Sequence, residues 1–124
     1  MTFMKIYISH SGNYNYKAEL YEPIKQSTLY KKHQIFLPHE PQNINLATKD
    51  IIASFDLLVA EVSRPSTGQG IEIGLASAAH IPIVGLFQPG TEPSSALKFY
   101  VQDILEYSDT SDLLHKLTTL VAAK

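Results

Sequence analysis

Short apolar runs alternate with amphipathic segments along the chain, and this alternation limits the possible folds more than any other feature. Four of the runs are rich in β-branched or aromatic residues and are bounded by turn-forming residues. They occupy residues 3–9, 33–38, 55–62 and 81–87, and a shorter run, DILEYS, follows at 103–108. Their length and composition predict strands.

The segments between these runs carry helix-compatible spacing. They cover residues 16–31, about 44–54 and 70–80, and a last segment has Ser111 as the expected N-cap before its leucines. Strands that alternate with helices need right-handed crossovers, which build a parallel sheet with helices on both faces. The sequence therefore predicts an α/β fold: a doubly wound, Rossmann- or flavodoxin-like parallel sheet of five strands in a single three-layer domain over residues 1–124.

Composition excludes several classes of function. The 124 residues include no cysteine, which rules out disulfides and thiolate metal sites and fits a reducing, cytoplasmic setting. No pair among the five histidines has metal-binding spacing, so we expect no metal and no cofactor. The net charge of −2 offers no broad basic surface for a nucleic acid polymer, and no apolar run reaches membrane-spanning length. We therefore expect a soluble protein whose partner is a small molecule.

Ligands of doubly wound folds bind at the carboxyl ends of the strands. Three loops leave such ends here, at residues 9–15, 63–70 and 88–95, and all three are rich in Gly, Ser, Thr or Asn. In the middle loop, Gly68 and Gly70 allow close backbone approach and open a helix whose first amides attract anions. The spacing fits neither a dinucleotide fingerprint nor a phosphate loop.

Glu72 lies one turn inside that helix. Ser66 and Gln69 already show the Ser-x-x-Gln pattern of a capping box, so the Glu72 carboxylate is not needed for capping. The carboxylate either suits the helix dipole or faces the crevice as an ionised nucleophile. Residue chemistry alone leaves both roles open.

A longer pattern surrounds this helix start. The segment FDLLVAEVSRPSTGQGIEIGLASA, residues 55–78, resembles the signature of the nucleoside 2-deoxyribosyltransferase superfamily, and especially of its small 2'-deoxynucleoside 5'-monophosphate N-hydrolases. KIYISHS near the start, and LFQPG with SSAL in residues 86–97, resemble the other two active-site loops of that family. The resemblance implies a homodimeric, cofactor-free enzyme that cleaves or transfers at the N-glycosidic bond of a (deoxy)nucleoside or nucleotide.

The resemblance also implies roles for individual residues. Glu72 matches the family's nucleophile, which forms a glycosyl-enzyme intermediate. Ser66 matches a residue that holds the 5' end of the substrate, and Ser95 matches one that the neighbouring subunit contributes. The other expected substrate-binding residues lie in the first strand, in its loop or in the glycine turn: Tyr7, Ser9, His10, Ser11, Asn13, Gly68 and Gly70.

One departure from the family pattern concerns the phosphate. Asn13 stands where the hydrolases carry an arginine that grips the phosphate, and His10 replaces a glycine. We therefore expect weak phosphate recognition, because asparagine cannot replace the charge of a guanidinium. Arg64 or His10 would have to supply a cation instead, and the place of Arg64 before Pro65 predicts a side chain that points to solvent.

A second departure concerns the proton donor that a departing base needs. Thr48 stands at the position where the family has its aspartate, and the nearest aspartate is Asp50. Two residues along a helix correspond to a rotation of about 200° around its axis, so Asp50 would lie on another side of the helix. Asp50 is either the donor, brought into place by a shortened connection to Phe55, or a solvated helix residue.

Three further polar residues lie near these loops. Asp56 opens its strand and is expected to be structural. Glu61, at the far end of that strand, is expected to pair with Lys or Arg in preference to a ligand. His39 either borders the base pocket, as its loop does in the family, or belongs to a surface loop, which the sequence favours.

Two other classes of function stay open. A nucleotide or nucleotide-sugar binding module would keep the fold and the turn but lose efficient catalysis. An NAD-cleaving domain is the third class, since IYISHSG resembles the first strand of a Toll/interleukin-receptor domain, although that family lacks the Gly-x-Gly-x-Glu-x-Gly turn.

Overall fold

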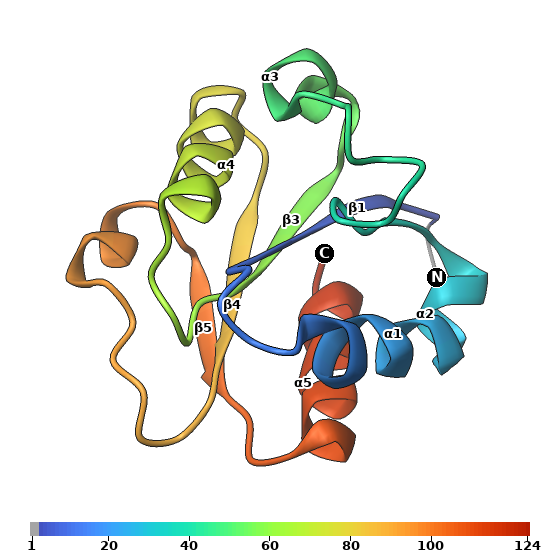
Figure 1. Ribbon diagram of the computed structural model, residues 1–124, viewed down its shortest axis with the longest axis vertical. Coiled ribbons are helices and arrows are strands. Elements are labelled where there is room, and N and C mark those ends of the chain that lie inside the picture. The colour runs from blue at the N-terminus through green and yellow to red at the C-terminus, as the bar shows by residue number, and fades with distance from the viewer. Residues whose placement is uncertain (1–2) are drawn as a thin grey trace.

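Five parallel strands form the centre of the molecule (Figure 1). The computed structural model describes residues 3–124. The strands lie in the order β2-β1-β3-β4-β5, and every neighbouring pair is parallel. Their bounds are β1 Lys5–His10, β2 Gln34–Phe36, β3 Leu57–Glu61, β4 Ile83–Phe87 and β5 Asp103–Glu106. This arrangement confirms the predicted doubly wound α/β fold.

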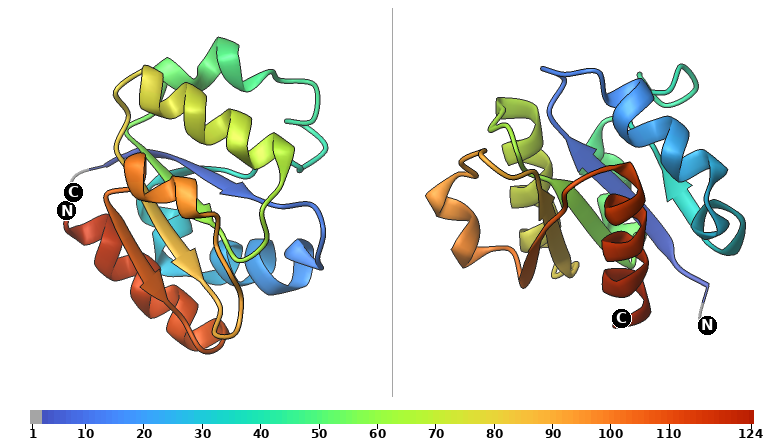
Figure 2. Two further views of the ribbon diagram at one scale, coloured as in Figure 1. Left: turned by 90° about the vertical axis from the view of Figure 1, so that its left-hand side faces the viewer. Right: turned by 90° about the horizontal axis from the view of Figure 1, so that it is seen from below.

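Helices cover both faces of the sheet, so the molecule has three layers (Figure 2). One face packs against α1, α2 and α5, and the other packs against α4 with short helical turns beside it. The helices are α1 Glu22–Gln26, α2 Thr28–Lys32, α3 Thr48–Ile51, α4 Thr67–Ala78 and α5 Thr110–Ala122, with a π-helical turn η1 Lys17–Tyr21 and 3₁₀ turns η2 Ile52–Ser54 and η3 Ser95–Phe99. Within residues 3–124, no helix is both long and apolar enough to cross a membrane.

The alternation of side chains along the central strands decides which layer each residue enters. Ile6 and Ile8 of β1 join the core beneath α1 and α5, whereas Tyr7 joins the core beneath α4. Neighbouring Leu57 and Leu58 of β3 divide between the two cores in the same way, and both are fully buried. Each such burial contributes about 1.5–3 kcal/mol, so a slip of one residue in register is strongly disfavoured. Tyr7 is therefore fixed on the face that α4 covers.

Two predicted helices are shorter than their spacing indicated. The segment 16–31 is divided at Ser27, whose extended backbone ends α1 and whose hydroxyl donates to the carbonyl oxygen of Ile24. The segment 44–54 is helical only from Thr48, because the chain before it makes successive turns held by the Asn43 side chain, which donates to the carbonyl oxygen of Leu37. Local side-chain bonds of this kind compete with helical bonds.

The two long helices are capped differently from the prediction. Ser66 is the N-cap of α4 and accepts the Gln69 backbone N–H, but the Gln69 side chain donates to the carbonyl oxygen of Glu61 at 2.7 Å. The capping box is therefore not reciprocal, and Gln69 instead ties α4 to the end of β3. The N-cap of α5 is Asp109, not Ser111, because the Asp109 carboxylate accepts the N–H of Asp112 at 2.8 Å.

Asp56 has the structural role that the sequence suggested. Its carboxylate accepts the backbone N–H of Lys5 at 2.8 Å and so joins the start of β3 to the start of β1. The contact lies at the opposite end of these strands from the glycine turn and helps to fix the β1–β3 register.

Candidate active site

Glu72 lies at the carboxyl ends of β1 and β3, where the order of the strands reverses direction. A sheet of order 2-1-3-4-5 binds its ligands at this switch point. One oxygen of the Glu72 carboxylate accepts the hydroxyl of Tyr7 and the other accepts the hydroxyl of Ser9, both at 2.7 Å. Two predicted site residues of β1 therefore hold the predicted nucleophile, which reaches them from α4.

A third hydroxyl extends this arrangement. Tyr7 has only one proton, which it donates to Glu72, so its oxygen accepts the hydroxyl of Thr48 at 2.9 Å. Burial, and then the charge of Glu72, raise the pKa of the Tyr7 phenol well above its usual range. Tyr7 therefore stays neutral and acts as a fixed donor toward the carboxylate.

The environment of Glu72 combines opposing effects. Burial raises the pKa of the Glu72 carboxyl, while the hydrogen bonds from Ser9 and Tyr7 and the nearby His39 act to lower it. The carboxylate is half-buried, and no cation forms an ion pair with it within residues 3–124. An oriented, partly desolvated carboxylate without a counter-ion keeps its electron pairs available for attack on an electrophilic carbon.

His10 is buried, and both of its ring nitrogens are engaged. One partner of the ring is the carbonyl oxygen of Ser11, which only accepts, so Nδ1 carries the proton and donates at 2.9 Å. Nε2 then accepts the hydroxyl of Tyr21 at 2.6 Å. Burial lowers the pKa of His10 to about 4, so the ring is neutral near pH 7 and provides no cation for a phosphate.

The other expected binding residues form no side-chain hydrogen bond to Glu72 within residues 3–124. Ser11 is buried and its hydroxyl oxygen accepts the N–H of Asn13, whose own side chain is exposed. Ser66 is half-buried at the start of α4. The remaining three residues are exposed: Gly68, Gly70 and Ser95. A Cβ added at either glycine would meet no atom within 4 Å outside the neighbouring helix backbone, so both glycines face open space.

Asp50 and Thr48 occupy different places relative to Glu72. Asp50 is exposed on α3, and no hydrogen bond or ion pair joins its carboxylate to another side chain in the described part of the chain. Thr48 lies two residues before Asp50 in α3, and its hydroxyl forms a hydrogen bond with the Tyr7 hydroxyl. The role of Asp50 as a donor stays a prediction, and the structure does not bring its side chain into the cluster around Glu72.

Arg64 does not point to solvent, so that expectation was wrong. Its guanidinium lies over the ring of Tyr14, 4.4 Å from the centroid, and Nη2 donates to Gln88 at 3.3 Å. The Nη1 atom and the Tyr14 hydroxyl are buried and have no hydrogen-bond partner within residues 3–124. Stacking on an aromatic ring explains why the side chain is held inward.

Glu61 is also placed differently from the prediction. It is buried, and among the described residues it makes no ion pair with Lys or Arg. Its carboxylate instead accepts the backbone N–H and the hydroxyl of Ser63, at 2.9 and 2.8 Å, together with the hydroxyl of Tyr107. These three donors satisfy the charge, so Glu61 is a structural carboxylate at the end of β3.

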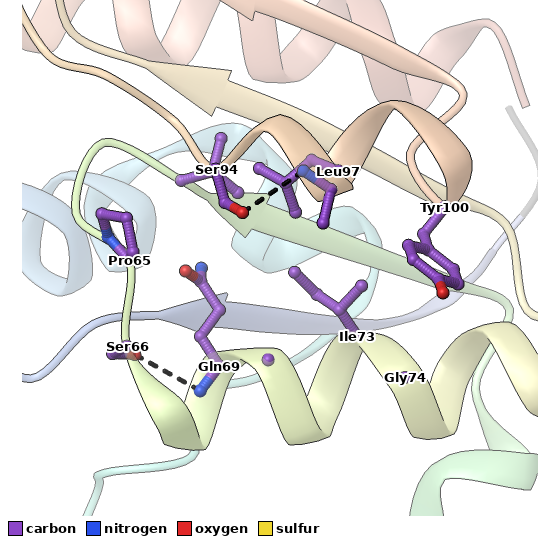
Figure 3. A pocket seen from close by; sticks show the side chains of 11 residues that line it. Pro65, Ser66, Gln69, Ile73, Gly74, Ser94, Leu97 and Tyr100 are labelled. Carbon is purple, nitrogen blue, oxygen red and sulfur yellow. Dashed lines mark hydrogen bonds between the residues drawn. The ribbon is translucent and has the colours of Figure 1, made fainter.

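A groove of about 470 Å³ runs between α4 and η3, beside the glycine turn (Figure 3). Gln69 and Ile73 point into it from α4, and Leu97 faces them from η3. Glu72 is not among the residues that line the groove, since its side chain turns toward β1. Ser66 borders the groove at the end nearest the turn.

Two residues of the site were missed or undervalued at the level of sequence. Thr48 was read only as the absence of an aspartate, although a hydroxyl at that position can bond the Tyr7 phenol. His39 belongs to an aromatic cluster with His10 and Tyr16, not to a free surface loop. Its position after β2, at the same edge of the sheet as Glu72, was the available signal. Within residues 3–124, no three His, Asp or Glu side chains are grouped to hold a metal ion.

Comparison with known proteins gives one curated relative and two solved structures of interest. No protein-family model matches the chain. A protein of Syntrophotalea carbinolica named "Putative 2'-deoxynucleoside 5'-phosphate N-hydrolase 1" is 48% identical over 65 residues, which are 50% of this chain and 46% of that protein. The match thus spans about half the length of the curated relative.

The solved structures extend the likeness to the whole fold. The CMP N-glycosidase BcmB of Clostridium botulinum superposes with a TM-score of 0.66 and 22% identity, covering 92% of this chain and 98% of BcmB. A conserved protein from Enterococcus faecalis V583 gives a TM-score of 0.61 at 22% identity, covering 95% and 99% of the two chains. The chain therefore resembles the nucleoside 2-deoxyribosyltransferase superfamily in sequence and in fold, as its residues had predicted.

Proposed function

We propose that this protein cleaves the N-glycosidic bond of a (deoxy)nucleoside or its 5'-phosphate, with Glu72 as the nucleophile. The observation that carries the proposal is the pair of 2.7 Å hydrogen bonds that orient the Glu72 carboxylate at the switch point of the sheet. The names of the curated relative and of BcmB, an N-hydrolase and an N-glycosidase of nucleotides, support the same reaction class.

In the proposed reaction, one oxygen of Glu72 attacks the anomeric carbon of the sugar. The bond between that carbon and the base nitrogen breaks, its electron pair leaves with the base, and a glycosyl ester of Glu72 forms. Water then attacks the same carbon, its lost proton balances the negative charge of the departed base, and the sugar and the free carboxylate are released. A second base in place of water would give transfer instead of hydrolysis. Tyr7 and Ser9 keep the carboxylate aimed during both steps.

The 5' end of the substrate is assigned to the edge formed by Ser11, Ser66 and the amides at Gly68 and Gly70. Open space beside these glycines and the helix start at Ser66 support this assignment. Asn13 is exposed and His10 is neutral, so neither gives a phosphate a positive partner. We propose that a 5'-phosphate is held by hydrogen bonds at this edge and contributes less affinity than a bidentate arginine would provide.

We further propose that the protein is a homodimer in which Ser95 reaches the neighbouring site. Ser95 is exposed at the start of η3. Phe99 and Tyr100, at the other end of this turn, are large exposed apolar side chains. An exposed apolar patch beside a groove is typical of an interaction surface.

A non-catalytic nucleotide-binding module is the second candidate. The exposure of Asp50 favours it, because a site that lacks a proton donor binds a nucleotide without releasing its base efficiently. Such a module would bind nucleosides or nucleotides and leave every one of them intact.

The test is base release from a panel of nucleosides and their 5'-monophosphates, with ribose and 2-deoxyribose members and NAD. We expect free base from at least one member, and we expect Glu72→Gln to lower the rate by roughly 10³-fold or more. Glu106→Gln, an exposed substitution on β5, is the matched control and should leave the rate unchanged. A 2-fluoro sugar analogue should leave a glycosyl adduct on Glu72 that mass spectrometry locates.

Two results would contradict the proposal. One is an unchanged rate in a folded Glu72→Gln variant, which would assign the nucleophile elsewhere. The other is binding of nucleotides without release of base from any of them, which would support the binding module. Release of nicotinamide from NAD alone would favour the NAD-cleaving class.

A further inference from the structure

Three loops leave the carboxyl ends of the strands, and Arg64 contacts two of them from the third. It belongs to the loop of residues 63–70, and its guanidinium lies over the ring of Tyr14 in the loop of residues 9–15. Its Nη2 atom donates to the side chain of Gln88, which begins the loop of residues 88–95. Arg64 is the single Lys or Arg residue in these three loops. The loops thus carry one positive charge, and it is held where they meet.

The guanidinium of Arg64 has no acidic partner. No ion pair joins it to a carboxylate within residues 3–124, and Glu61, three residues earlier in the chain, is satisfied by Ser63 and Tyr107. A partly buried cation loses hydration, and a carboxylate normally offsets that cost. The arrangement therefore indicates that the partner of Arg64 is an anion from outside the chain.

Stacking on Tyr14 occupies the face of the guanidinium and leaves the N–H groups at its rim free to donate. Of the two terminal nitrogens, Nη2 bonds to Gln88, whereas Nη1 is buried and has no partner in the described part of the chain. The Tyr14 hydroxyl is buried and unpartnered in the same way. Burial raises the pKa of the Tyr14 phenol well above its usual range, so the hydroxyl keeps its proton. Two unused donors, one of them on a cation, therefore lie on two stacked side chains.

The stacked pair borders the edge proposed above for the 5' end of the substrate. Along the chain, Arg64 lies two residues before Ser66, and Tyr14 lies three residues after Ser11. Arg64 and Tyr14 are half-buried, and neither belongs to the two apolar cores, so the pair lies close beneath the surface of the loops. A buried polar atom without a partner calls for an explanation such as a bound water or ion.

We propose that Arg64 and Tyr14 bind the 5'-phosphate of a nucleotide substrate, an inference that rests on the proposed function. Small rotations of the two side chains bring Nη1 and the Tyr14 hydroxyl to two oxygens of the phosphate. A phosphate suits these donors because it is an anion with several acceptor oxygens. Nη2 stays with Gln88, so the charged contact goes through one nitrogen and remains weaker than a bidentate one. The substrate class is then a nucleoside 5'-monophosphate.

Binding to the Glu72→Gln protein, measured by calorimetry, tests this assignment on ligands that stay intact. The probes are deoxycytidine and deoxyguanosine, their 5'-monophosphates, and their 3'-monophosphates, which carry the same charge at another position of the sugar. Arg64→Met removes the charge, and Tyr14→Phe removes only the hydroxyl. Lys31→Met, exposed on α2, removes an equal charge elsewhere and is the matched control. Circular dichroism and thermal melting check that each variant is folded.

We expect Arg64→Met to weaken binding of a 5'-monophosphate by roughly tenfold or more, and Tyr14→Phe to weaken it by about two- to tenfold. In both variants, the affinities for the nucleosides and the 3'-monophosphates should change by less than about twofold. Lys31→Met should leave every affinity unchanged. A loss confined to the 5'-monophosphates identifies a direct contact, because a disturbed loop would weaken all the ligands alike.

Three outcomes would overturn the assignment. Equal losses for a nucleoside and its 5'-monophosphate would make Arg64 a structural tie between the loops. Equal losses for the 3'- and 5'-monophosphates would reduce its role to a general attraction of anions. No loss for the 5'-monophosphate, or no binding of it at all, would show that the two unused donors hold water only.

These outcomes are distinguishable from a failure of the proposed function. If the binding results contradict the role of Arg64 while the unmodified protein releases base and Glu72→Gln does not, the inference fails and the proposed function stands. If the unmodified protein releases base from no member of the panel, the proposed cleavage fails. The calorimetry still decides in that case whether Arg64 and Tyr14 bind a 5'-phosphate.

Discussion

Each oxygen of the Glu72 carboxylate accepts one hydrogen bond from a hydroxyl group. This arrangement suits a nucleophile better than an ion pair would. A bound Lys or Arg would fix the carboxylate equally well but would neutralise its charge and hold its electron pairs. Hydroxyl donors from Tyr7 and Ser9 fix the direction of the side chain and leave the charge in place. Thr48 adds to this by orienting the Tyr7 hydroxyl.

His10 gives a prediction about stability and pH. Its pKa in the folded protein, about 4, lies below the unperturbed value of 6.5, so the unfolded chain takes up the proton first as the pH falls. The neutral His10 ring makes its full contribution to the free energy of unfolding above pH 6.5. This contribution, which is at most about 3 kcal/mol, is lost as the pH falls toward 4. We expect the free energy of unfolding, measured in denaturant, to decrease over this range.

The variant His10→Gln isolates this contribution, because every other titrating group is shared. It should be less stable than the unmodified protein at pH 7.5, and the gap should narrow as the pH falls to 4.5. Parallel curves for the two proteins would show that the imidazole of His10 titrates in the same way folded and unfolded. His115→Gln, which removes an exposed histidine, should give the same curve as the unmodified protein.

The strands were predicted well, and the helices less well, for reasons that differ between elements. The strands are apolar runs, as buried parallel strands require, and residues such as Ile6, Ile8 and Leu58 are part of the core. The apolar residues that predicted the strands are therefore the residues that the sheet buries. The helix break at Ser27 depends on one side-chain bond that spacing does not reveal. Thr48 and His39 were undervalued because their contacts join segments far apart in the chain, which a linear pattern does not contain.

The capping of α5 is a prediction at the scale of one element. Asp109 accepts the N–H of Asp112, and the Asp112 carboxylate in turn accepts the N–H of Ser108, so two unpaired donors are satisfied reciprocally. We expect Asp109→Ala to lower the free energy of unfolding by about 1 kcal/mol. Ser111→Ala should change it by less than about 0.5 kcal/mol, because Ser111 is exposed inside the first turn. Equal losses in denaturant titrations would show that the cap is not at Asp109.

At the scale of the whole molecule, the position of Ser95 matters more than its chemistry. The residue lies on η3, on the far side of the groove from α4, and is exposed within one subunit. A second subunit that packs on this surface would bring the two glycine turns and the two η3 segments into one assembly. The proposed dimer thus makes each site depend on both chains.

Mixing two inactive variants tests this dependence. Glu72→Gln lacks the nucleophile, and Ser95→Trp blocks the 5' end of the neighbouring site. In a mixed dimer, one of the two sites combines an intact Glu72 with an intact Ser95, so an equal mixture of exchanged subunits should recover about a quarter of the full rate. No recovery after exchange, or full activity of Ser95→Trp alone, would show that each chain carries a complete site.

The central pairing of the sheet also decides when the protein can fold. β1 pairs with β3, and the hydrogen bond from Lys5 to Asp56 that begins this pairing joins residues 51 positions apart. Closing so long a loop is slow compared with forming local helical contacts. During synthesis on the ribosome, β1 and β2 are made first, and the edge of β1 that β3 later covers remains unpaired. The nascent chain is therefore most open to aggregation in the interval between the synthesis of its first and third strands.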